Sequence, residues 1–234
     1  MKLARVFVVA LSGLALTGAV QAQSFNIDIG NATGGTGGPA PSNAFGAAAG
    51  QVGFWNNMTT QTSMLLNDLG NLATLVTLTR STTAGNTFGF DNTGTTGDFG
   101  LLMDDGQDLS ASTGLVSFTF TGLANGTYSV YTYAWAPDVP GSDKTDVSVV
   151  GAVQGMQVVG GNLPANNTFA LGITHALHTV TVTNGMLTIQ VDGDAATSSF
   201  GTINGIQLVG NVPAPGALAL LGMAGITGRR RRRI

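Results

Sequence analysis

The sequence between residues 23 and 211 contains many short segments in which apolar and polar side chains alternate. Residues 116–121 alternate Val or Phe with Ser or Thr, and residues 179–183 alternate Thr with Val. A period of two residues puts one set of side chains on each face of a β-strand, so each segment is expected to be a half-buried strand. Further strands are expected at residues 25–29, 72–79, 145–150, 153–159 and 203–209. The pattern predicts an all-β protein, folded as a two-sheet β-sandwich of jelly-roll type.

The composition supports a fold rich in strands and turns. All 12 acidic residues are Asp, Glu is absent, and 35 residues are Gly. Glu favours helices, whereas Asp and Gly favour turns. The chain has no Cys, so we expect neither a disulfide framework nor thiol chemistry.

Two Asn-Gly pairs, at residues 125–126 and 184–185, each separate two alternating segments. Asn-Gly is the preferred pair for the two-residue type I′ turn, because both of its central residues need a positive φ. The sequence therefore predicts that each pair closes a β-hairpin.

The charge of residues 23–211 is strongly negative. This segment contains all 12 Asp residues but only two basic residues, Arg80 and Lys144, so its net charge is 2 − 12 = −10. An acidic surface repels the phosphate backbone, which excludes nucleic acid as an expected partner.

The first 22 residues have the pattern of a secretory signal peptide. Lys2 and Arg5 precede an apolar run at 6–16, and Val20-Gln21-Ala22 has small residues at the −3 and −1 positions. We expect signal peptidase to cut between Ala22 and Gln23, which would export the rest of the chain.

The last 23 residues, 212–234, combine three different parts. Pro213-Ala214-Pro215 is followed by an apolar run at 216–228 and by the five arginines Arg229, Arg230, Arg231, Arg232 and Arg233. A helix of this length is shorter than the ~30 Å hydrocarbon core, so we expect a short transmembrane helix that anchors weakly. Terminal arginines favour the cytoplasmic side, which places residues before Pro213 outside.

This order of parts resembles the sorting tail of PEP-CTERM proteins, which are substrates of the exosortase class of membrane proteases. Here Ala214 replaces the Glu of the Pro-Glu-Pro box, a Pro-Ala-Pro variant, and Gly216 follows it where Ser or Thr is usual. The resemblance implies an exosortase-like protease as a partner, transient anchoring in the membrane, and delivery to the cell surface or extracellular matrix. The alternative is a permanent C-terminal anchor.

Two segments of the body carry a second resemblance. GLANGTYSVYTYAWAPD at 122–138 and TINGIQLV at 202–209 are similar to a hairpin and a closing strand of galactose-binding-like and malectin-like jelly rolls. The resemblance implies sugar binding through loops at one end of the sandwich. Aromatic side chains that could stack on a sugar are Trp55, Tyr131, Tyr133 and Trp135, of which the last three share one strand face. The alternative is that these aromatic residues belong to the core.

The densest group of carboxylates is Asp104, Asp105 and Asp108, together with Gly106 and Gln107. Ca²⁺ prefers six to eight oxygen ligands, so an acidic turn at this position is a candidate calcium site. The alternative is a solvated acidic turn without a metal.

The sequence does not predict an enzyme. His175 and His178 are three residues apart, a spacing that directs them to opposite faces of a strand. No G-x-S-x-G motif is present, and no pair of carboxylates has the spacing of a glycosidase. We therefore expect a non-enzymatic exported protein of the cell surface or matrix. The alternative is a carbohydrate-binding module on the same export route, with surface polysaccharide as its partner.

Overall fold

The computed structural model describes residues 23–30, 38–83, 87–110 and 114–211, all of which belong to one compact unit. The predicted signal peptide (1–22) lies outside the described residues, and so does the tail with Pro213, Ala214, Pro215 and Arg229 to Arg233. In the described part of the chain, no helix is long and apolar enough to cross a membrane.

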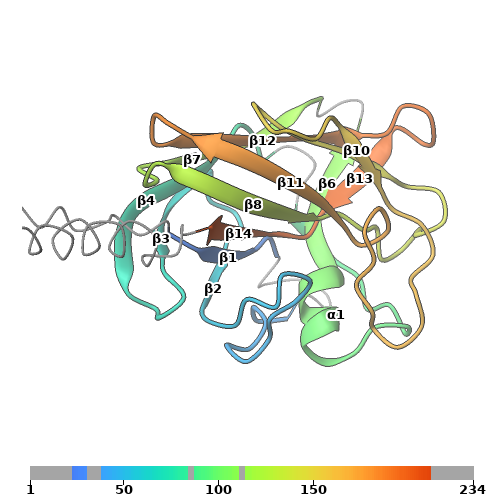
Figure 1. The fold of residues 1–234 in the computed structure, drawn as a ribbon. Coiled ribbons are helices and arrows are strands. Elements are labelled where there is room, and N and C mark those ends of the chain that lie inside the picture. The colour runs from blue at the N-terminus through green and yellow to red at the C-terminus, as the bar shows by residue number, and fades with distance from the viewer. Residues whose placement is uncertain (1–22, 31–37, 84–86, 111–113, 212–234) are drawn as a thin grey trace, which may run out of the picture. The chain divides into compact units, whose positions relative to one another are not determined.

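Two β-sheets pack face to face, which confirms the predicted sandwich (Figure 1). One sheet has five strands in the order β11 (His175–Val182), β8 (Gly126–Tyr133), β14 (Gly205–Asn211), β1 (Phe25–Asp28) and β2 (Trp55–Asn57). The other has six, in the order β10 (Gln157–Val159), β9 (Thr145–Val149), β12 (Met186–Gly193), β7 (Val116–Thr121), β4 (Ala73–Arg80) and β3 (Ser63–Asn67). Within these two sheets, the described strands pair antiparallel except for β1 with β2.

The alternating residues fill the space between the two sheets, as the period of two predicts. From β7, Phe118 and Phe120 are completely buried, and from β12, Leu187 and Ile189 are at most 2% exposed. Val180 of β11 enters the same hydrophobic cluster from the facing sheet. The predicted core of valines and phenylalanines is therefore confirmed.

A small third sheet and one helix were not predicted from the sequence. The sheet has the order β13 (Phe200–Ile203), β6 (Asp105–Ser110) and β5 (Thr87–Gly89), and the helix α1 (Gly97–Met103) immediately precedes β6. Thr96 is the N-cap residue of α1, and Asp98 lies in the first turn, where a negative charge complements the helix dipole. The two glycines of this seven-residue helix weaken its sequence signal.

The two predicted hairpins are wrong. β7 pairs with β4 and β12, whereas β8 pairs with β11 and β14, so the segment containing Asn125-Gly126 leads from one sheet to the other. The same holds for Asn184-Gly185, because β11 pairs with β8, and β12 with β7 and β9. Each connection is therefore a β-arch, in which the two apolar strand faces oppose each other across the core.

The backbone explains why these pairs do not form type I′ turns. Gly185 has φ 74°, but neither Asn125 nor Asn184 has a positive φ, which both central residues of that turn require. The two arches instead contact each other. Leu123 donates its backbone N–H to the Gly185 carbonyl (3.0 Å), and the Gly185 N–H is donated to Oδ1 of Asn125 (3.2 Å). They close one end of the sandwich together.

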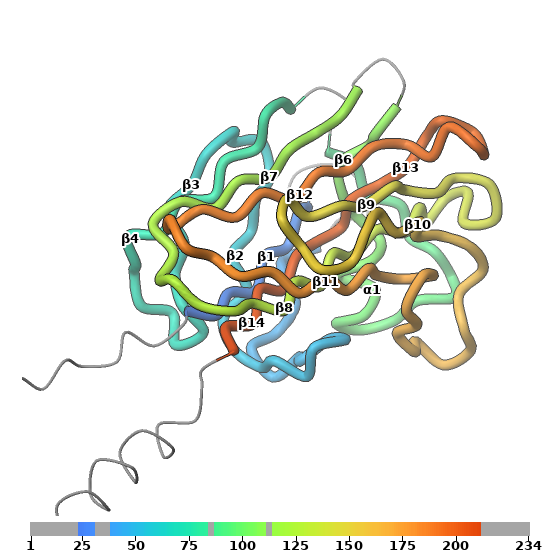
Figure 2. The backbone as a smooth tube through the Cα atoms, turned by 45° about the horizontal axis from the view of Figure 1, so that its top comes forward, coloured from blue at the N-terminus to red at the C-terminus, as the bar shows by residue number. Residues whose placement is uncertain are grey.

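The body begins and ends on neighbouring strands. β1 and β14 pair antiparallel, with Phe25 opposite Leu208 and Asp28 opposite Gly205 (Figure 2). The chain therefore enters and leaves the sandwich at the same end of β1. The opposite end of β1 leads toward residue 58, because Met58 donates its backbone N–H to the Asp28 carbonyl (2.8 Å).

Candidate binding site

The predicted aromatic residues come together, but in the interior. Tyr131, Tyr133 and Trp135 share one face, as predicted, and join Trp55 in a second hydrophobic cluster that includes residues of α1. Trp55, Tyr133 and Trp135 are 3%, 0% and 1% exposed, and Tyr131 is partly buried. A sugar ring cannot stack on a covered aromatic face, so these residues follow the alternative given by the sequence, in which they belong to the core and do not form a stacking platform.

The polar atoms of this cluster fasten loops to the sheet. Trp55 donates its indole N–H to the carbonyl of Phe45 (3.2 Å), and Trp135 donates its own to the carbonyl of Gly161 (2.8 Å). The hydroxyl of Tyr133 accepts a backbone N–H from the loop that precedes β2. Buried Trp and Tyr side chains need such partners, and here these bonds hold the connections over the outer face of the five-stranded sheet.

The three carboxylates of the predicted calcium turn have different surroundings. Asp104 accepts a hydrogen bond from the Thr95 hydroxyl (2.6 Å), Asp105 is buried near Asp28, and Asp108 is exposed on β6. They diverge because the segment after Asp104 is an extended strand, in which successive side chains point to opposite faces. Within the described ranges, no group of three or more His, Cys, Asp or Glu residues could hold a metal ion. The calcium site proposed from the sequence is thus not assembled.

Asp28 and Asp105 form a buried acidic pair. Burial raises the pKa of the Asp28 carboxyl well above its usual value, and the nearby Asp105 raises it further. Asp28 is completely buried and Asp105 is 1% exposed. Both carboxyl groups therefore belong to the interior of the protein.

The two histidines point to opposite faces of β11, as predicted. His175 contacts the outer aromatic cluster, at 5.8 Å from the Tyr131 ring, and burial lowers its pKa to about 4. His178 points to the other face, where its Nε2 donates to the carbonyl of Gly155 (3.1 Å). The two rings therefore cannot bind one metal ion together.

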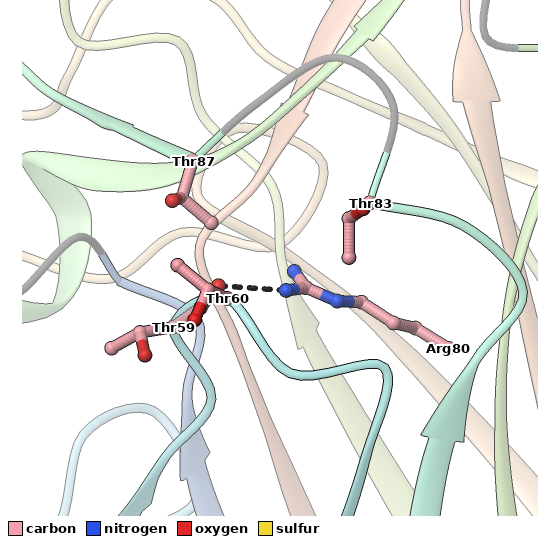
Figure 3. Close-up of a pocket in the computed structure, with 5 residues that line it drawn as sticks. All are labelled: Thr59, Thr60, Arg80, Thr83 and Thr87. Atoms are coloured by element: carbon pink, nitrogen blue, oxygen red, sulfur yellow. Dashed lines mark hydrogen bonds between the residues drawn. The ribbon is translucent and has the colours of Figure 1, made fainter.

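A polar pocket with a volume of about 440 Å³ opens beside the end of β4. Four threonines and one arginine from separate parts of the chain line it (Figure 3). Thr59 and Thr60 follow β2, Arg80 ends β4, Thr83 follows it, and Thr87 begins β5. The volume is within the range of small-molecule sites, although the lining is far more polar than is usual for them.

The guanidinium of Arg80 is the charged group of this pocket. Arg80 is only 2% exposed, because it continues the inward-facing series of Val76 and Leu78 along β4. Its Nη1 donates to Oε1 of Gln107 (3.1 Å), and its Nη2 donates to the carbonyl of Thr59 (2.7 Å). Its Nε is buried and makes no hydrogen bond.

No acidic side chain compensates this charge. Both hydrogen-bond acceptors of Arg80 are neutral, and the part of the chain that the structure describes contains no ion pair to it. Burial lowers the pKa of Arg80, yet guanidinium groups keep their proton in proteins. The pocket thus contains a permanent positive charge that neutral groups hold in place.

Sequence reasoning missed this pocket. The signal was present, since Arg80 is one of two basic residues in 23–211 and stands in phase with the buried residues of its strand. The threonines gave no signal, because they come from two connections and from the first residue of β5, and their proximity depends on strand pairing that the sequence does not specify.

No protein-family model matches this chain, and no curated protein matches it. Among solved structures, it is similar to the YxiM protein of Bacillus subtilis, with 11% identity over 81% of this chain and 40% of that chain, and a TM-score of 0.38. It is also similar to a CBM35 module from Cellvibrio japonicus (17% identity, 58% and 94% of the two chains, TM-score 0.31). A third match is the carbohydrate-binding module CBM6cm-2 of Cellvibrio mixtus lichenase 5A in complex with cellotriose. The sequence identity is 13% over 55% of this chain and 98% of that chain, with a TM-score of 0.23.

The chain spans less than half of the length of the YxiM chain. All three TM-scores are below 0.5, so the fold and the site of this protein are taken from its own strand order and contacts.

Proposed function

We propose that this chain is an exported, non-enzymatic carbohydrate-binding protein that holds its ligand in the pocket around Arg80. The observation that supports this most directly is the lining of the pocket, which among the described residues consists of four threonines and one arginine. Sugar hydroxyls both donate and accept hydrogen bonds. Thr hydroxyls do the same, and a guanidinium adds several donors, so this lining matches the chemistry of a sugar.

The same lining favours binding over catalysis. Glycoside hydrolysis normally uses two carboxyl groups, one on each side of the scissile bond. Of the lining residues that the structure describes, none is acidic. The acidic pair Asp28 and Asp105 is buried in the interior and is not among the described residues that line the pocket.

The two ends of the chain supply the delivery route in this proposal. The pattern of residues 1–22 supports export by signal peptidase, and Pro213-Ala214-Pro215 with Arg229 to Arg233 supports sorting by an exosortase-like protease. β14 pairs with β1 so that Leu208 lies opposite Phe25, at the end of β1 away from Asp28. Thr59 follows Met58, whose backbone N–H bonds to the carbonyl of Asp28 at the other end of β1. The last described residues and the pocket therefore lie toward opposite ends of β1.

A glycan array with purified residues 23–211 tests the proposal. We expect retention on a subset of surface polysaccharides, because the pocket offers a fixed set of hydrogen-bonding groups. A matched control is Thr119→Val, which removes a hydroxyl from the face of β7 that does not enter the core; binding should be unchanged. A folded body that no glycan retains would contradict the proposal and leave a purely structural role.

A further inference from the structure

We infer that the Arg80 pocket selects an acidic sugar residue, one that carries a carboxylate or a sulfate group. The inference rests on the proposed function and specifies its ligand class. A neutral sugar would satisfy the threonines of the pocket but would leave the charge of Arg80 uncompensated.

The first argument is the cost of the buried charge. Removing a guanidinium from water is unfavourable unless a counter-charge or hydrogen bonds replace the lost hydration. Arg80 is 2% exposed, and its two acceptors, Gln107 and the carbonyl of Thr59, are neutral. An anion in the pocket would supply the missing counter-charge. Anionic ligands would therefore stabilise the buried guanidinium more than neutral ligands would.

The second argument is the number of donors that remain. A guanidinium has five N–H groups in a planar fork, which fits two oxygens of a carboxylate or sulfate at once. Arg80 uses one N–H on Nη1 and one on Nη2, and Nε makes no hydrogen bond. Figure 3 shows Thr60, Thr83 and Thr87 around the guanidinium, so threonine side chains line the space beside it.

The third argument limits the size of the ligand. Residues 23–211 have a net charge of 2 − 12 = −10, which repels a long polyanion. At physiological ionic strength this repulsion is screened beyond about 8 Å, whereas a contact inside a buried pocket is screened much less. The charges therefore favour one acidic residue, such as a chain end, over a densely charged polymer.

The test is calorimetric titration of residues 23–211 with glucuronate, glucose 6-sulfate and glucose. We expect at least one of the two acidic sugars to bind about tenfold or more tightly than glucose, which lacks the charge-assisted hydrogen bonds. Arg80→Gln should reduce acidic-sugar affinity to the level of glucose, and Arg80→Lys should keep part of the preference. Lys144→Gln, which removes the other basic residue of the body, should leave the preference unchanged.

The response to each acidic sugar shows which anionic group the pocket binds. Glucuronate alone would assign a carboxylate, and glucose 6-sulfate alone would assign a sulfate. If Arg80→Gln does not fold, Arg80→Lys answers the same question. It keeps the charge but loses the planar fork, so acidic-sugar affinity should fall several-fold while glucose affinity stays the same.

Two results would overturn parts of the proposal separately. Equal binding of glucose and both acidic sugars, unaffected by Arg80→Gln, would refute acidic selectivity and leave carbohydrate binding intact. Binding of inorganic sulfate that Arg80→Gln abolishes, without binding of any sugar or glycan, would instead support the anion site and refute the carbohydrate function. If neither sulfate nor an acidic sugar binds, the inference fails.

Discussion

At Arg80 a guanidinium occupies the inward position that Val76 and Leu78 occupy earlier in β4. The long side chain reaches past the hydrophobic core to the carbonyl of Thr59 and the amide of Gln107. One residue thereby links the segment after β2 to β6 and gives the pocket its charge. The sequence can identify an inward-facing charged residue, because the residue falls at every second position with the buried residues of its strand. The sequence does not identify the groups that bind this residue.

A prediction at the scale of one residue concerns Asp104. Burial raises the pKa of its carboxyl to about 6, the hydrogen bond from Thr95 acts in the opposite direction, and Asp91 raises the value. Because the folded-state pKa is above the unfolded value of ~3.9, the folded protein binds more protons between about pH 4 and pH 6. The contribution of Asp104 to stability is therefore greatest below pH 4 and is lost as the pH rises through 6.

Asp104→Asn should remove this loss, since an amide stays neutral and its oxygen can still accept from Thr95. We expect the variant to be more stable than the parent by on the order of 1–2 kcal/mol at pH 7.5, and equally stable near pH 4. Urea unfolding at pH 4, 6 and 7.5 measures the difference, and the exposed Asp138→Asn serves as a control. A difference that does not change with pH would show that the ionisation of Asp104 is not its cause.

At the scale of strands, the sequence predicts most elements but not how they pair. Alternation located β1, β4, β7, β8, β9 and β12 and parts of β10, β11 and β14, because the period of two is a local property. The two Asn-Gly connections look the same in sequence whether they close a hairpin or an arch, since both arrangements give each strand one apolar face. The choice depends on the partner strands, which lie far away in the chain.

The third sheet gives a prediction at this scale. A Cβ atom at Gly106 of β6 would lie 2.5 Å from the Ile203 carbonyl oxygen and 2.8 Å from Cγ2 of Thr202, both in β13. Gly106→Ala should therefore force β6 and β13 apart and lower the free energy of unfolding by on the order of 1–3 kcal/mol. Gly155→Ala is the matched control, because nothing lies within 4 Å of its Cβ position. Similar urea midpoints for the two variants would contradict the close packing at Gly106.

At the scale of the whole molecule, composition and alternation were sufficient for the sandwich, and the aromatic residues of β8 were correctly placed on one face. Their burial was one of the two alternatives that the sequence offered, but the sequence did not decide between them. The burial depends on the segment before β2 and on the segment around Gly161, which cover the sheet through backbone hydrogen bonds to Trp55 and Trp135. Irregular connections have no periodic signal, so the sequence could not distinguish a covered face from a binding face.

The processing of the chain is predicted at the same scale. We expect exported protein to begin at Gln23, because Val20-Gln21-Ala22 matches a signal-peptidase site. We expect surface material to lack Arg229 to Arg233, and a variant without residues 213–234 to enter the medium folded. Intact-mass measurement tests both ends. A mature N-terminus at Met1 would refute the signal peptide, and a body that still carries Arg233 would identify a permanent anchor.

The position of β14 has a mechanical consequence. β14 lies between β8 and β1, is paired with β8 from Gly205 to Asn211, and is paired with β1 from Gly205 to Leu208. A pull on Asn211 acts along the strand, across hydrogen bonds that are perpendicular to it, so these bonds share the load. If the body is held at Asn211, tension between this point and a ligand at the far end of β1 would be carried by the middle of a sheet. Such a body resists mechanical unfolding when liquid flow exerts force on its bound ligand.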